Sequence, residues 1–118
     1  MTYASPPDEE IYGMGLEYTV WNFKGHEVPL IVNEGGVGRG QQPITMWENM
    51  HGGQGGSPVT SYGPTPNYIT NKNRGFIFNT TELGIADFKA KDATSFLFWH
   101  ATKLEGVIMY GDGPLELA

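Results

Sequence analysis

The chain has 118 residues, among them 17 glycines and 8 prolines, and its formal net charge is −6. This length suits one domain, and seven scattered Lys and Arg residues in an acidic chain exclude a nucleic-acid ligand, which needs clustered basic side chains. The sequence has no cysteine, which excludes a disulfide framework and a thiolate zinc site, and no stretch approaches the ~20 apolar residues of a membrane span.

Residues 1–10 predict a disordered lead-in. Pro6 and Pro7 stand before three acidic residues, so this segment has little to bury. It also lacks the apolar core of a signal peptide, so we expect a soluble chain with no membrane partner and favour the cytoplasm as its compartment. The folded domain is therefore placed at residues 11–118.

The first part of this domain predicts a β-hairpin. Residues 16–23 alternate apolar with polar or aromatic side chains, which is typical of a strand with one drier face. Residues 24–26 predict a tight turn around glycine. Residues 28–32 predict the second strand, and Pro29 favours an edge or a bulge because it cannot donate to a ladder.

A glycine-rich loop over residues 34–43 interrupts this pattern. Pro43 can occupy the first position of a short helix. Three apolar residues then follow at a spacing of three, near one side of that helix: Ile44, Trp47 and Met50. Residues 51–57 are again rich in glycine, and two such loops around one helix indicate either function or flexibility.

The second half predicts six short strands separated by turns, at residues 59–62, 68–70, 76–79, 83–88, 94–100 and 104–110. The strand at 94–100 is apolar on both faces, so we expect it to be buried between two layers. With the hairpin, about eight strands predict an all-β fold, a two-layer antiparallel sandwich with one short helix after a glycine-rich loop.

Most catalytic motifs are excluded by spacing. The glycines at 35–40 lack the third glycine of the dinucleotide fingerprint, since position 41 is Gln41, and no Gly-Lys-Ser/Thr follows them. No Gly-x-Ser-x-Gly nucleophile motif occurs. The three histidines are far apart in the sequence and predict no metal site. We expect no cofactor and assign no catalytic residue.

Carbohydrate binding is the remaining option, because sugars are held by aromatic faces and planar amide or guanidinium groups. Such a set lies near the two glycine-rich loops: Arg39, Gln41, Gln42, Trp47, His51 and Tyr62. The alternative is that Trp47 and Tyr62 belong to the core, which composition favours for Trp47. Glu34 lies near Arg39 in the sequence, and a loop-ordering ion pair is favoured over a catalytic acid there.

Five segments in order resemble glycoside hydrolase family 31, in its bacterial α-glucosidase and sulfoquinovosidase branch. Residues 11–18 resemble a Gly-x-Gly-Glu-aromatic opening, and 23–30 resemble the lysine–glycine hairpin that follows it. Residues 34–45 carry the most specific likeness, Glu-Gly-Gly-Val-Gly-Arg-Gly-Gln-Gln-Pro-Ile-Thr. Residues 62–70 and 110–116 resemble the next segment and the exit toward a catalytic barrel.

This resemblance implies an incomplete galactose-mutarotase-like N-terminal sandwich from a retaining α-glycosidase. The family's nucleophile and acid/base are barrel aspartates that would follow residue 118, and none of the four aspartates here matches either motif. We therefore expect this chain to lack the catalytic carboxylates and the barrel. It departs from the family's Gly-Glu-Gln opening, because Leu16 precedes Glu17 and Tyr18 stands where glutamine would be.

The implied role is to brace the barrel and to lend residues 34–45 to the rim of the substrate pocket. Arg39 and Gln42, with Gln41 and Glu34, are the residues expected to bind substrate, by positioning it rather than by proton transfer. The implied partners are a carbohydrate and the barrel. A stand-alone carbohydrate-binding sandwich is the alternative, and the sequence leaves open which glycoside is bound, whether it is sulfonated, and the oligomeric state.

Overall fold

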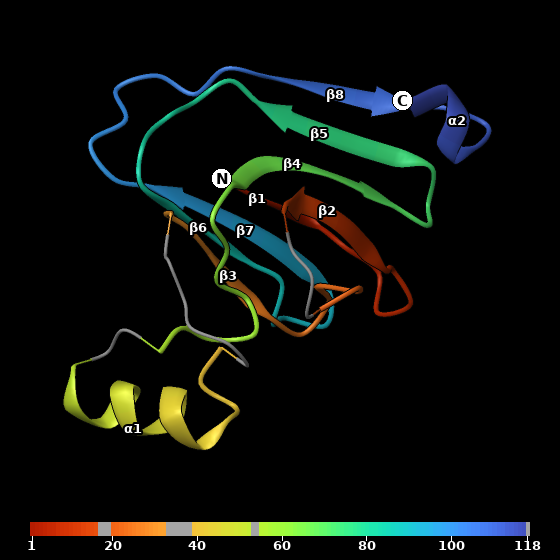
Figure 1. The fold of residues 1–118 in the computed structure, drawn as a ribbon. Coiled ribbons are helices and arrows are strands. Elements are labelled where there is room, and N and C mark those ends of the chain that lie inside the picture. The colour runs from red at the N-terminus through yellow and green to blue at the C-terminus, as the bar shows by residue number, and fades with distance from the viewer. Residues whose placement is uncertain (17–19, 33–38, 53–54, 118) are drawn as a thin grey trace.

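The computed structural model describes residues 1–16, 20–32, 39–52 and 55–117. Within them the chain forms two antiparallel four-stranded sheets and two helices (Figure 1). The strands are β1 (Thr2–Ala4), β2 (Ile11–Gly15), β3 (Glu27–Leu30), β4 (Pro64–Thr70), β5 (Arg74–Phe78), β6 (Gly84–Asp87), β7 (Ala93–Phe98) and β8 (Gly106–Tyr110), and the helices are α1 (Pro43–His51) and α2 (Pro114–Leu117).

The two sheets have the strand orders β1-β7-β6-β3 and β2-β4-β5-β8. Every pairing within them is antiparallel. The buried apolar side chains lie between the sheets, and they are Ile11, Met14, Phe23, Val28, Tyr68, Phe76, Phe78, Ala86, Phe88 and Phe96. The predicted two-layer antiparallel sandwich and its short helix after the glycine-rich loop are confirmed.

Stacked aromatic rings join the two layers. The Phe96 ring of β7 lies 5.6 Å from the Tyr68 ring of β4 and 4.6 Å from the Phe78 ring of β5. Tyr3 of β1 stacks on Phe76 of β5 at 4.7 Å. Each such pair contributes about 0.5–1.5 kcal/mol beyond the burial of its area. The ring contacts therefore help to hold the two sheets against each other.

Two predicted strands differ from the structure. The predicted strand at 16–23 is wrong where it can be compared, because β2 ends at Gly15 and Phe23 donates its N–H to the Ile11 carbonyl at 2.9 Å. Residues 17–19 lie outside the described residues. Residues 59–62 form turns and one isolated parallel bridge, from Ser61 to Val32, in place of a strand.

Strand β4 begins earlier than its proline content suggested. Pro64 and Pro66 lie in it, although the sequence predicted a loop there. Pro64 pairs with Gly15 of β2, whereas the pairing with β5 begins only at Asn67. One side of β4 is therefore unpaired at its prolines, so their missing N–H groups cost no ladder hydrogen bond there.

Strand β7 is central in its sheet, between β1 and β6. Its two faces differ, however: Thr94 and Phe96 point into the core, while Leu97 is 56% exposed. The prediction that residues 94–100 are buried on both faces is therefore wrong for the outer face. The described chain leaves that face of the sheet partly open to solvent.

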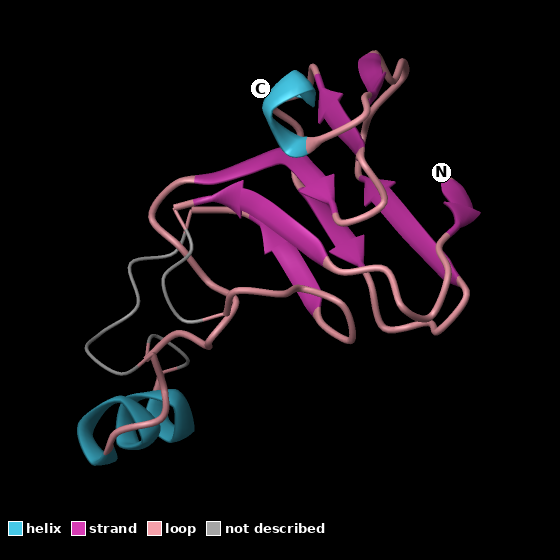
Figure 2. Cartoon of the chain, turned by 90° about the vertical axis from the view of Figure 1, so that its right-hand side faces the viewer, coloured by secondary structure: helices cyan, strands magenta, loops and turns pink. Residues whose placement is uncertain are grey.

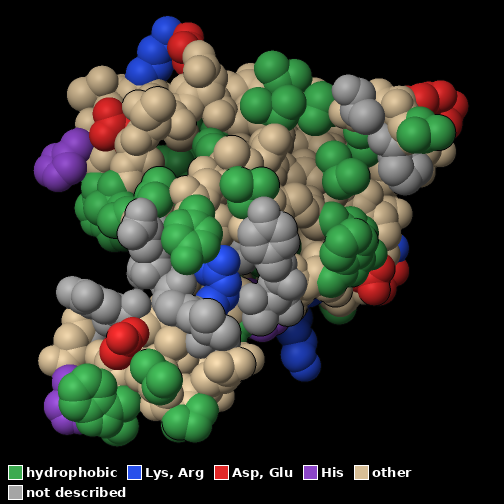
Figure 3. Space-filling model, in the orientation of Figure 1, with side chains coloured by type: hydrophobic (Ala, Val, Ile, Leu, Met, Phe, Trp, Pro, Cys, Tyr) green, Lys and Arg blue, Asp and Glu red, His purple; other side chains and the backbone are tan. Residues whose placement is uncertain are grey.

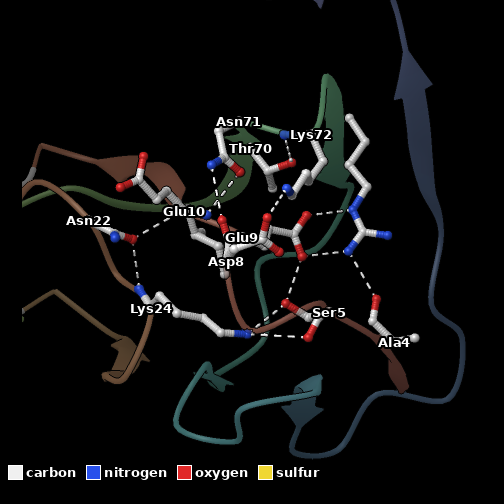
Figure 4. Close-up of polar contacts among 12 residues, drawn as sticks. Ala4, Ser5, Asp8, Glu9, Glu10, Asn22, Lys24, Thr70, Asn71 and Lys72 are labelled. Atoms are coloured by element: carbon white, nitrogen blue, oxygen red, sulfur yellow. Dashed lines mark hydrogen bonds and ion pairs between the residues drawn. The ribbon is translucent and has the colours of Figure 1, made fainter.

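The prediction of a disordered lead-in at residues 1–10 is contradicted by the structure. Thr2–Ala4 form β1 and pair with β7, and the Glu9 side chain is fully buried. Figure 4 shows the polar cluster that holds this segment. Arg74 donates from Nε to Glu9 Oε1 at 2.6 Å and from Nη2 to Oε2 at 2.5 Å, and the Ser5 hydroxyl donates to Oε2 at 2.6 Å.

Burial of Glu9 by itself would raise the pKa of its carboxyl group, but hydrogen bonds from Arg74, Ser5 and Thr70 outweigh it and lower the pKa from its ordinary value. Arg74 also donates to the Ala4 carbonyl at 2.9 Å, and Lys24 donates to the Ser5 hydroxyl at 2.8 Å. The acidic run that suggested disorder thus contains Glu9, whose charged carboxylate pairs with Arg74 inside the fold.

The Glu9–Arg74 pair makes stability depend on pH. Because the pKa of Glu9 is lower in the folded chain, the unfolded chain takes up its proton first, and this stabilisation is present above the unfolded pKa and lost as pH falls through the folded pKa. We expect Glu9→Gln to destabilise the fold by about 3 kcal/mol at neutral pH, since Arg74 loses its charged partner. We also expect the melting temperature of this variant to fall less than that of the wild type when the pH is lowered.

The measurement is the melting temperature by circular dichroism from neutral pH to pH 3. Glu27→Gln is the matched control, since Glu27 pairs with Lys89 on the surface and exposed pairs stabilise little. Identical acid profiles for the wild type and Glu9→Gln would show that Glu9 does not carry this effect.

Candidate functional site

A loop and a helix project from the sandwich. We call residues 39–52 and 55–62 the projecting segment; α1 lies in it, apart from both sheets (Figure 1, Figure 2). It contains three of the four residues predicted to bind substrate, namely Arg39, Gln41 and Gln42. The fourth, Glu34, lies outside the described residues, as does the predicted contact between Glu34 and Arg39.

Arg39 ties the beginning of the projecting segment to its end. Its guanidinium Nη1 donates a hydrogen bond to the carbonyl oxygen of Thr60. The guanidinium carbon also lies 5.5 Å from the centre of the Tyr62 ring, as in a cation–π contact. The half-buried Arg39 side chain is therefore held in place, and a guanidinium has further N–H donors beyond the one that Thr60 accepts.

The start of α1 places two amides at the surface. Gln42 is the N-cap residue, and its side chain makes no capping hydrogen bond. Thr45 supports this turn instead: its hydroxyl accepts from the Gly40 N–H at 3.0 Å and donates to the Gln42 carbonyl at 3.1 Å. Gln41 and Gln42 are both exposed and follow the half-buried Arg39 closely in the chain.

The glycines allow the two loops to approach each other closely. A Cβ atom at Gly55 would lie 2.0 Å from the Thr45 carbonyl oxygen, and one at Gly40, whose φ is 82°, would lie 2.6 Å from the Gly56 carbonyl oxygen. The Asn49 amide then donates to Gly56 at 2.8 Å. These glycines are therefore needed for the close packing of the two loops. This role is consistent with a glycine spacing that does not match the nucleotide-binding motifs.

The outer surface of α1 is apolar. Ile44, Met46 and Met50 are exposed, and Trp47 is 58% exposed; Figure 3 shows hydrophobic side chains on the lobe that α1 forms. The Trp47 ring stacks on His51 with centroids 4.3 Å apart and planes 24° apart. The interpretation of Trp47 as a core residue is therefore wrong, because α1 buries only Thr45.

Tyr62, the other aromatic residue considered for the core, is also half-exposed and supports the Arg39 guanidinium. Thr45 and Thr60, which hold the projecting segment together, were missed by sequence reasoning. The position of Thr45 three residues after the N-cap residue is a signal for its role. Nothing in the sequence pointed to Thr60, because its contact with Arg39 spans 21 residues.

Asp8 and Glu9 are poorly suited to act as general acids. A general acid needs a raised pKa, whereas a hydrogen bond from Lys72 lowers the pKa of Asp8, and the pKa of Glu9 is also lowered. Within the described ranges, no three His, Asp or Glu residues converge as metal ligands, and no helix is long and apolar enough to cross a membrane.

The fold is similar to parts of solved enzymes. The structure is similar to a family GH31 sulfoquinovosidase from E. rectale, solved with the aza-sugar inhibitor IFGSQ, with a TM-score of 0.83 and 22% identity over 94% of this chain and 17% of that chain. It is also similar to a cycloalternan-forming enzyme from Listeria monocytogenes, with a TM-score of 0.58 and 20% identity over 98% of this chain and 8% of that chain.

The sequence points to the same group of enzymes. The chain is 28% identical over 98 residues to the sulfoquinovosidase of Escherichia coli K12, and 26% identical over 93 residues to that of Agrobacterium fabrum C58. The matches cover 81% and 78% of this chain but only 14% of each relative. No protein-family model matches the chain. The resemblance to part of a family 31 glycoside hydrolase is thus confirmed.

The Arg39 contacts predict a local effect of mutation. We expect Arg39→Met to raise amide exchange rates in α1 and at Gly40, because the projecting segment loses the link between its two ends. The melting temperature should change little, since α1 lies outside the core. Hydrogen exchange followed by mass spectrometry measures both regions, and Lys103→Met, at an exposed site in another part of the chain, is the control. Unchanged exchange in α1 would contradict the role given to Arg39.

Proposed function

We propose that this chain is part of the N-terminal sandwich of a retaining α-glycosidase, and that its projecting segment lies at the rim of the substrate pocket. The observation that carries this proposal is the set formed by Arg39, Gln41 and Gln42. A guanidinium held by Thr60 and Tyr62 stands next to two exposed amides on a segment that extends beyond the sandwich.

This set suits the positioning of a sugar. Guanidinium and amide groups are planar and donate several hydrogen bonds, so they can bridge neighbouring hydroxyl groups of a glycoside or its leaving group. Arg39 and Gln42 are proposed as the principal contacts, with Gln41 beside them and Glu34 as a fourth. Their role is to orient the substrate, which accelerates the reaction without proton transfer.

The apolar surface of α1 supports the second part of the proposal, which is contact with a catalytic barrel. Exposed apolar patches on a folded domain commonly mark an interface, and Ile44, Trp47 and Met50 together provide one here. The relatives are about seven times longer than the region matched, as their 14% coverage implies. In this proposal the barrel packs near α1, and the sandwich braces it.

The chemistry itself is assigned to that barrel. Retaining glycosidases need a nucleophilic carboxylate about 5 Å from a carboxylic acid that protonates the leaving group. The lowered pKa values of Asp8 and Glu9 suit structural ion pairs instead of a general acid. The substrate class proposed is an α-glucoside or sulfoquinovoside, and the chain alone is expected to be inactive.

A second candidate function is favoured by Trp47. Its exposed indole is oriented by the stacked His51 ring, and exposed aromatic faces are typical of carbohydrate-binding modules. An independent sugar-binding sandwich would bind a glycoside saturably without a barrel. Calorimetric titration of the chain with methyl α-glucoside, compared with Trp47→Ala, separates this function from the first.

The principal test is a hydrolysis assay with para-nitrophenyl α-glycosides, including a sulfoquinovoside. We expect no turnover by the chain alone above a mock purification. A chimera in which this chain replaces the matched part of the Escherichia coli sulfoquinovosidase should be active. In that chimera Arg39→Ala should raise KM by about tenfold or more, because a hydrogen bond from a charged group contributes ~1.5–3 kcal/mol.

The matched control in the chimera is Lys103→Ala, which removes a positive charge from an exposed position near β8. Turnover by the chain alone would overturn the assignment of catalysis to the barrel. An active chimera in which Arg39→Ala and Gln42→Ala behave like Lys103→Ala would overturn the proposed rim contacts.

A further inference from the structure

The turn that carries Arg39 and Gln42 has an unfavourable backbone conformation at its first residue. Arg39 has a φ of 45°, in the left-handed region that few residues other than glycine adopt, and Gly40 follows with a φ of 82°. A conformation of this kind persists only where the surrounding contacts hold it. Gln42, at the other end of the turn, is extended, with φ −103° and ψ 156°. The relative placement of Arg39 and Gln42 therefore depends on what fixes the backbone between them.

The hydroxyl of Thr45 fixes that backbone from both sides. Thr45 is buried, and its hydroxyl accepts from the Gly40 N–H while it donates to the Gln42 carbonyl. A hydroxyl can donate one hydrogen bond and accept others, so one group closes the turn around Gln41. Among the described residues, no other side chain hydrogen-bonds to the backbone of residues 39–42.

This arrangement leaves the side chain of the N-cap residue available. An N-cap residue commonly uses its own side-chain oxygen to accept from an N–H group of the first helical turn. Gln42 makes no such bond. Thr45, three residues later, supports the same turn through its hydroxyl. The exposed Gln42 amide can therefore serve a ligand without weakening the start of α1.

The guanidinium group of Arg39 is fixed separately from its backbone. Its acceptor is the carbonyl of Thr60, and Thr60 is held by reciprocal bonds with Ser57. The Ser57 N–H donates to the Thr60 hydroxyl at 2.8 Å, and that hydroxyl donates to the Ser57 carbonyl at 2.9 Å. The Arg39 side chain is thus fixed at its tip through Thr60 and at its base through Thr45, and only Thr45 also reaches Gln42.

We propose that Thr45 is a positioning residue of the proposed sugar site, and that its buried hydroxyl holds Arg39 and Gln42 in a fixed arrangement. Because Thr45 acts through these two residues, its role rests on the proposed function. Its side chain is buried beneath the turn and makes no contact with the substrate itself. Loss of the hydroxyl should therefore weaken sugar binding only by letting Arg39 and Gln42 move apart, since a bound sugar needs both groups in place.

The first test uses the full chain and measures amide hydrogen exchange at Gly40 by NMR. Thr45→Val keeps the size of the side chain but removes the acceptor of the Gly40 N–H, so this amide should exchange about fivefold faster. Thr45→Ser keeps the hydroxyl and should behave like the wild type. A role in packing alone predicts the reverse order, because serine lacks the methyl group that valine keeps. Thr102→Val, at an exposed site near β8, is the matched control.

The second test uses the chimera with the Escherichia coli sulfoquinovosidase and para-nitrophenyl sulfoquinovoside. We expect Thr45→Val to raise KM by about fivefold with kcat nearly unchanged, the pattern of lost substrate binding. Thr45→Ser should restore KM to within about twofold of the wild-type chimera. In an Arg39→Ala background, Thr45→Val should change KM by less than about twofold, because residues that act through one another are not additive.

The outcomes distinguish the role of Thr45 from the proposed function. If Arg39→Ala and Gln42→Ala leave KM unchanged, the rim contacts are overturned and the role of Thr45 with them. If those variants raise KM but Thr45→Val does not, only the role of Thr45 is overturned. The same holds if Thr45→Ser is impaired as much as Thr45→Val, or if both speed exchange throughout α1, since Thr45 would then support the helix by packing.

Discussion

The buried pair of Glu9 and Arg74 joins parts of the structure that are distant in the sequence. Glu9 follows the N-terminal strand β1, Arg74 begins β5 of the opposite sheet, and the same guanidinium bonds to the Ala4 carbonyl and lies over the Tyr3 ring. Tyr3 in turn stacks on Phe76. The position of β1 over the core, and with it the closure of one side of the sandwich, thus depends on one charge pair that is satisfied by several hydrogen bonds.

From this core the chain extends the projecting segment, whose last residues are tied to the sandwich because Val59 packs against the core and Ser61 bridges to Val32. Arg39 connects its two ends through Thr60 and Tyr62. Glycines allow its loops to pack closely against Thr45. A site built in this way can hold polar groups in fixed positions outside the sandwich, as binding loops on a rigid scaffold commonly do. The fold as a whole is similar to part of a family GH31 sulfoquinovosidase.

Two further surfaces of the described residues are apolar and exposed. The apolar residues of α1 and the uncharged edge of β8 both lack partners among the described residues, whereas β2 and β3 carry ordinary protection against pairing. Exposed apolar patches and uncharged strand edges commonly mark interaction surfaces.

Local patterns in the sequence determined the elements that depend on near neighbours: the helix after Pro43, most of the later strands, the sandwich class and the family resemblance. They also selected Arg39, Gln41 and Gln42, because residue type and nearby glycines are visible along the chain. Tertiary structure alone decided that residues 1–10 are ordered, that Pro64 and Pro66 lie in a strand, and that Trp47 is exposed. Each of these outcomes depends on a partner that is remote in the sequence or missing: Arg74 for Glu9, Gly15 for Pro64, and no core contact for Trp47. Burial and pairing arise from such long-range contacts, so periodicity and composition could not reveal them.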